Sequence, residues 1–302
     1  MTYQTTVTAE PAKGSARDWR ALGFVFPVAI GMAVLIVPTL RGIADVSWST
    51  EQGAHGPIVL AIAIWLFARR WPAIRAAAEP GSALIGGIVL AMTLLSYIAT
   101  RVVGSIVLES LSLYGALVAT LYLMVGWRGM RQAWFAIAYF LFVLPPPGSL
   151  VAIATQPLRL QLSAFAVIIL AKFGLPVAQE GLLIYIGQYT LEVKAACSGL
   201  NSIISLSAIG LFYAYIRHKD NVMYMVVLAG VIVAMAILAN LCRVMLLVLI
   251  TYFLGNDAAQ GFLHQFAGIT MFVVALAGTM AFDVLAERYW PTLVNGRSGV
   301  QA

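Results

Sequence analysis

The stretch Ala195-Ala196-Cys197-Ser198-Gly199-Leu200-Asn201-Ser202 joins two segments of opposite character. Upstream, residues 179–194 alternate apolar and polar side chains, which predicts a short hairpin or extended segment. Downstream, residues 203–216 form an apolar run that predicts a helix. Cys197 is therefore expected at a helix N-terminus. The free N–H groups and partial positive charge there favour a thiolate and can hold an oxyanion.

Three alternatives to a nucleophilic Cys197 stay open. Cys197 can be a small buried hydrophobic residue, the common fate of a lone cysteine. Cys242 is a rival nucleophile, but it lies inside an apolar run that predicts a helix, where no N–H groups are free. It also points about 100° away from Arg243 around that helix. Ser198 is a weaker rival.

The composition predicts a membrane protein. Of 302 residues, 62% are hydrophobic and 10% are charged, and the mean hydropathy is +0.93. A soluble domain is far less apolar, so we expect an all-α polytopic membrane protein. One membrane-embedded domain, 21–285, is expected between cytoplasmic tails at 1–20 and 286–302. The first apolar run follows a polar segment too long for the start of a signal peptide, so we interpret it as a true span.

Eight apolar runs predict about eight transmembrane helices. They are 21–40, 57–67, 82–100, 102–127, 133–144, 199–216, 221–254 and 266–285. The sequence Pro145-Pro146-Pro147-Gly148 must end the fifth. Residues 157–173 carry several polar side chains and predict an interfacial helix. The run 221–254 exceeds the roughly 20 residues that a bilayer needs, so it must tilt, kink near Asn240, or protrude.

The distribution of basic residues predicts the orientation. With the N-terminus in the cytoplasm, twelve of the 18 Lys and Arg residues fall in inside segments. This is the asymmetry that the positive-inside rule requires. It also accounts for the net charge of +6 without a nucleic-acid partner. Both termini are then cytoplasmic.

This topology, with eight spans and a cytoplasmic N-terminus, brings rare reactive side chains to one membrane surface. Cys197, Arg243, His264 and His55 all fall near the extracytoplasmic face, where we place the active site. Cys197 would be the nucleophile that forms an acyl-thioester, and His264 the general acid and base. Arg243 would stabilise the transition state or the substrate through its fork of N–H donors.

Each of these side chains also has a structural explanation. Arg243 can snorkel to the interface, and His264 can be an ordinary interfacial histidine. Asn240 lies on the same helix face as Arg243 and can brace it or a substrate amide. The three histidines are scattered along the chain and make no metal-ligand spacing, so we expect neither a metal nor a cofactor.

Several blocks together resemble the exosortase/archaeosortase family of membrane cysteine transpeptidases. The blocks are 196–202 around Cys197, Asn240-x-x-Arg243, and His264-x-x-x-Gly268. Upstream, His55-Gly56 with its apolar run, the proline-rich segment at 144–146, and residues 181–193 also match. Each block is modest alone, but their order and spacing over residues 50–285 are specific.

The resemblance implies an activity and site residues. It implies catalytic roles for Cys197, Arg243 and His264, with Ser198, Gly199, Asn201, Asn240 and His55 in support. It implies a protease and transpeptidase that cleaves C-terminal sorting signals of exported proteins and transfers them to a cell-envelope acceptor. Such a signal has a Pro-Glu-Pro-like motif (PEP-CTERM), a transmembrane helix and a basic tail. Many bacterial members accompany exopolysaccharide loci. Many members carry an acidic residue before the cysteine and arginine at the position of Asn201; this chain departs at both, which leaves its recognition motif open.

Two other classes of function compete with this one. A polytopic transporter or an exopolysaccharide export or biosynthesis component would explain the many spans and the broken fifth helix. Transporters usually place working polar groups near the bilayer midplane, whereas here they gather at one surface. A structural scaffold would leave that clustering unexplained. The oligomeric state is left open by the sequence.

Overall fold

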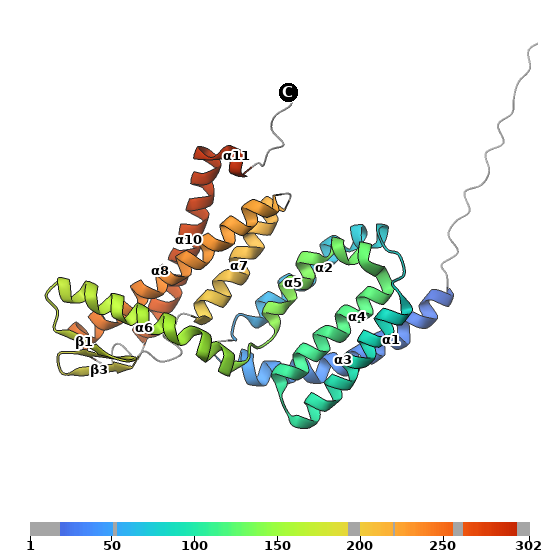
Figure 1. The fold of residues 1–302 in the computed structure, drawn as a ribbon, viewed down its shortest axis with the longest axis horizontal. Helices are drawn as coiled ribbons and strands as arrows, with labels where there is room; N and C mark the ends of the chain where they lie inside the picture. The colour runs from blue at the N-terminus through green and yellow to red at the C-terminus, as the bar shows by residue number, and fades with distance from the viewer. Residues whose placement is uncertain (1–18, 51–52, 193–199, 220, 256–261, 295–302) are drawn as a thin grey trace, which may run out of the picture.

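Helices dominate the computed structural model, which describes residues 19–50, 53–192, 200–219, 221–255 and 262–294. Seven helices in this part of the chain are long and apolar enough to cross a membrane by length and composition. Long helices pack side by side, and a small sheet lies at one extremity (Figure 1). The predicted class, an all-α polytopic membrane protein with a short extended segment, is confirmed.

Four long helices form the first half of the chain, and glycine and serine residues set their ends. The Ser82 hydroxyl accepts a hydrogen bond from the N–H of Ile85, a typical N-cap. Gly104 closes the same helix in the left-handed conformation that glycine adopts without strain. The elements are α1 (Trp19–Ile43), continued by the π-helix η1 (Ala44–Trp48), α2 (Gly56–Ala76), α3 (Ala83–Val103) and α4 (Ile106–Gln132).

The predicted fifth span is shorter than a bilayer requires. It consists of α5 (Trp134–Phe140) and the 3₁₀ turn η2 (Leu141–Val143), and it ends at the proline run as predicted. It still returns the chain from one end of the bundle to the other. Ala133 packs with Ile74 near the end of α2, whereas Val143 belongs to the core that contains Val59 near its start.

The next helix, α6 (Gly148–Lys172), is longer than the interfacial helix predicted at 157–173. Its 25 residues meet the length and composition of a membrane span. In Figure 1 it runs across one end of the bundle toward the sheet, and its second half packs against α8. The interfacial assignment of this segment stays a prediction, since α6 also has the length and composition of a span.

A three-stranded antiparallel meander follows α6. The strands β1 (Val177–Glu180), β2 (Leu183–Ile186) and β3 (Tyr189–Glu192) are joined by two-residue turns. Each turn begins with a glycine at positive φ, Gly181 and Gly187, as tight hairpin turns require. Ile184 and Ile186 are completely buried against α6 and α8. The predicted hairpin is therefore a meander anchored on two helices.

The remaining long helices form an antiparallel group: α7 (Leu200–His218), α8 (Val222–Leu254) and α10 (Phe262–Tyr289), with the short α11 (Pro291–Val294) after them. The 33 residues of α8 form one continuous helix about 50 Å long. Of the three alternatives for this run, the structure does not show the kink, because α8 continues through Asn240. Such a length must tilt or protrude from a bilayer, as the sequence also predicts.

The bundle has two ends, named here by a residue that lies at each. The His55 end holds His55, Trp48, Val143 and the start of α7. The Arg217 end holds Arg70, whose Nε donates to the hydroxyl of Tyr215 at 2.7 Å, and the turn from α7 to α8. The described start of α1 and the end of α10 both lie away from the His55 end (Figure 1).

Candidate functional site

The stretch around Cys197 connects the sheet to α7. Strand β3 ends at Glu192 and α7 begins at Leu200, so the chain passes from one to the other through 193–199. Cys197, Ser198 and Gly199 lie in this segment, outside the described residues. Asn201 belongs to the first turn of α7. The predicted change from an extended segment to a helix is therefore present, with the helix starting within the quoted stretch.

Arg243 and Asn240 are both buried in the middle of the helical group. Their exposed fractions are 8% and 4%. They line one small cavity of about 10 Å³ between α7 and α10, together with Leu206, Ala236, Ala239, Met271, Phe272 and Ala275. A snorkelling arginine keeps its guanidinium at the surface. The burial of Arg243 therefore argues against that interpretation.

His264 and His55 both lie at the starts of helices. His264 lies in the first turn of α10, about two helical turns before Met271 of the Arg243 cavity. His55 precedes α2 as its N-cap residue. Its neighbour Gly56 packs on the indole of Trp48, where a Cβ atom would collide. The structure thus places His55 beside a second cavity rather than beside Arg243.

Cys242 lies on the opposite side of α8 from the buried residues. Its side chain is exposed, whereas the adjacent Arg243 is buried. It is also inside a continuous helix, where the backbone N–H groups are already bonded. Its position therefore supports the preference for Cys197 over Cys242.

The second cavity, at the His55 end, has a volume of about 590 Å³. Its walls come from η1, the start of α2, η2, the proline run, the first half of α6, and Ile204 of α7. It therefore adjoins the helix that the Cys197 stretch opens. The lining residues are Val46, Ser47, Trp48, Thr50, Gly53, His55, Gly56, Ile106, Val107, Leu141, Phe142, Val143, Leu144, Pro145, Pro146, Gly148, Val151, Ala152, Thr155, Arg159 and Ile204.

The family model of the transmembrane exosortases matches residues 48–281. The chain belongs to the transmembrane exosortase family. The match contains the Cys197 stretch, Arg243, His264, His55 and all of the lining of the 590 Å³ cavity except Val46 and Ser47. Family membership supports a membrane transpeptidase-like role with exported proteins as substrates in general. No curated protein and no solved structure matches the chain.

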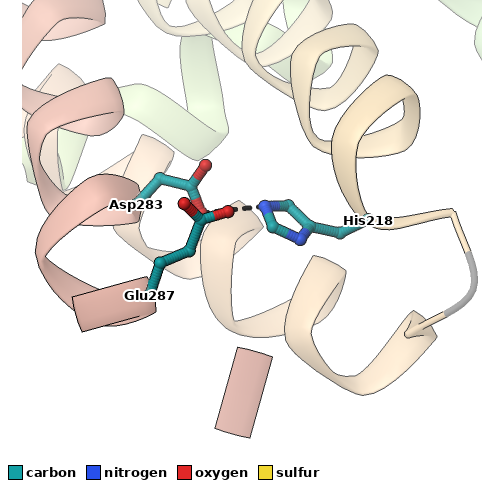
Figure 2. A group of neighbouring side chains, drawn as sticks. All are labelled: His218, Asp283 and Glu287. Carbon is teal, nitrogen blue, oxygen red and sulfur yellow. Dashed lines mark hydrogen bonds and ion pairs between the residues drawn. The ribbon is translucent and has the colours of Figure 1, made fainter. Parts of the chain in front are cut away.

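A buried polar cluster at the Arg217 end of this exosortase was missed by the sequence-based search for metal ligands. Donor atoms of His218, Asp283 and Glu287 lie within 4.8 Å of one another (Figure 2). That search considered histidines alone. The missed signal was Asp283, a carboxylate within the apolar run 266–285, since acidic residues are rare in membrane spans and mark specific interactions.

Hydrogen bonds assign this cluster a role in holding three helices together. The Asp283 carboxylate is fully buried and accepts from the hydroxyls of Tyr213 and Tyr224, at 2.7 and 2.8 Å. Nε2 of His218 lies 2.9 Å from it. Arg217 lies 3.5 Å from Asp283 and also pairs with Glu287. The Asp283 carboxylate on α10 therefore connects the end of α7 to the start of α8 through these hydrogen bonds.

We expect Asp283→Asn to destabilise the folded protein by about 3–5 kcal/mol, because it breaks a buried charged network. The control is Glu287→Gln, which removes a half-exposed ion pair worth about 0–1 kcal/mol. Thermal unfolding of the purified proteins in detergent measures both. If the cluster instead held a metal ion, a chelator would lower the unfolding temperature and the Glu287 variant would lose stability as well.

Proposed function

We propose that this exosortase cleaves C-terminal sorting signals of exported proteins and transfers the new carboxyl end to a cell-envelope acceptor. The observation that carries the proposal is the family match over 48–281, which spans the cysteine, arginine and histidine blocks in order. The burial of Arg243 between α7 and α10 supports it. These are the helices that follow Cys197 and that carry His264.

The chemistry assigned to the three side chains is acyl transfer. The Cys197 thiolate attacks the scissile carbonyl, and Arg243 or the N–H groups opening α7 hold the resulting oxyanion. The intermediate collapses to a thioester as His264 protonates the departing amine. An acceptor nucleophile, or water, then loses its proton to His264 and attacks the thioester. The thiolate is released and the cycle closes.

The assay for this function is the processing of an exported reporter protein. The reporter carries a sorting signal with a Pro-Glu-Pro motif, an apolar helix and a basic tail. Cells that make this chain should convert the reporter to a shorter form, and matched cells without the chain should not. Immunoblotting and mass spectrometry of the new carboxyl end give the cleavage site. An uncleaved reporter in both strains, with the chain inserted normally, would refute the proposal.

The proposed orientation places the cysteine, arginine and histidine blocks at the extracytoplasmic face of a bacterial inner membrane, with both termini in the cytoplasm. The whole length of α8 separates Lys219 from the segment that precedes α10. Reporter fusions after Lys219 and after His264 should therefore give cytoplasmic and external signals, respectively. Signals from the same side at both positions would contradict the topology.

A further inference from the structure

The 590 Å³ cavity at the His55 end has the dimensions and position of a ligand site. Ligand pockets in proteins usually measure about 300–1,000 Å³. One wall is Ile204, in the second turn of α7, so the cavity lies close to where the Cys197 stretch enters that helix. Proline residues 145 and 146 and the apolar side chains of η2 form a rigid opposite wall.

Two buried N–H donors in this cavity have no acceptor within the described part of the chain. They are Nε of Arg159 and Nε1 of the Trp48 indole. Arg159 is only 9% exposed, and one terminal nitrogen donates to the carbonyl of Ala152 at 3.2 Å. The rest of its five-donor guanidinium is left for another partner.

The cavity also carries a positive charge, and the described part of its lining supplies no acid to match it. Arg159 remains charged in proteins. None of the described lining residues is an aspartate or a glutamate, and among the described residues Arg159 forms no ion pair. A buried charge is stabilised by a counter-charge, so an anion bound beside Arg159 would lower the energetic cost of its burial.

We propose that this cavity binds an acidic, extended segment of the substrate, with the terminal nitrogens of Arg159 donating to a carboxylate. The inference rests on the proposed function for the kind of substrate, a polypeptide delivered to Cys197. Arg159 is thereby a specificity-determining residue, since the planar guanidinium fork matches the geometry of a carboxylate. It takes no part in the acyl transfer.

The test is direct binding, which does not depend on cleavage. The full chain in phosphatidylcholine nanodiscs, free of anionic lipid, is titrated with a fluorescent peptide containing Ala-Ala-Pro-Glu-Pro-Ala-Ala and with its Pro-Gln-Pro counterpart. A charge-assisted hydrogen bond should make the glutamate peptide bind about 10–100-fold more tightly. Arg159→Gln should abolish this preference. Trp48→Phe changes another lining residue of the cavity without touching the charge and should keep the preference.

Matched controls separate the site from general charge and from misfolding. Arg131→Gln removes an exposed arginine away from the cavity and should leave the preference unchanged. If Arg159→Gln does not fold, judged by its unfolding temperature, Arg159→Lys keeps the charge and should reduce the preference through loss of the fork. Equal or absent binding of the two peptides by the parent, or a preference that survives loss of Arg159, would overturn the proposal. A preference without reporter processing would refute only the proposed function.

Discussion

Replacing Cys197 by alanine is expected to reduce reporter processing to background. The proposed mechanism passes through a thioester on this sulfur, and alanine offers no atom that can form one. In a serine protease, loss of the nucleophile costs on the order of 10⁶-fold in turnover. Immunoblots of the reporter, with equal membrane levels of both proteins, measure the effect.

The chain supplies its own matched control, because it contains two cysteines. Cys242→Ala removes an exposed thiol from the opposite side of α8 and should leave most of the processing intact. A thiol-alkylating reagent should inactivate the Cys242→Ala protein as completely as the parent. Processing that survives Cys197→Ala but not Cys242→Ala would reverse the assignment of the nucleophile.

Arg243→Lys is expected to lose about 10²–10³-fold of the processing rate, the usual effect of removing one oxyanion donor. Lysine keeps the charge but cannot reproduce the two-donor fork of a guanidinium. The burial of Arg243 leaves a flexible ammonium little room to compensate, since the adjoining cavity is only about 10 Å³. His264→Ala removes the proposed proton transfer and should cost about 10²–10⁴-fold.

Membrane insertion has to be measured separately for these variants. A snorkelling arginine tolerates lysine, because both side chains snorkel. Arg131→Lys, at an exposed position, serves as the matched control. If the Arg243→Lys protein inserts normally and processes the reporter at the parental rate, Arg243 is an anchor. The site then reduces to Cys197 and His264, and the N–H groups opening α7 must hold the oxyanion.

Much of the fold follows from local sequence. Hydropathy over some twenty residues predicts a spanning helix because every backbone polar group must be bonded inside a bilayer. This reasoning predicted the class, most helix positions and the turn at the proline run. It left tilting, kinking and protruding open for α8, and the structure shows no kink at Asn240, because a polar residue in a helix causes a kink only where it disturbs the backbone bonds. It predicted an interfacial helix at 157–173, where the structure has the longer α6, which has the length and composition of a membrane span.

Some features of the candidate site also follow from local sequence, whereas others depend on the tertiary structure. The sequence by itself determined the family blocks around Cys197, Arg243 and His264, and the shared face of Asn240 and Arg243, because these depend on spacing along one helix or on short motifs. Only the tertiary structure revealed the cavity that contains Arg159 and Trp48, and the network around Asp283. In each case the partners lie far apart in the chain. The role of a charged side chain then depends on the residues that surround it after folding. Burial removes water from a guanidinium or a carboxylate, and the energy of the group then depends on partners that no local pattern specifies.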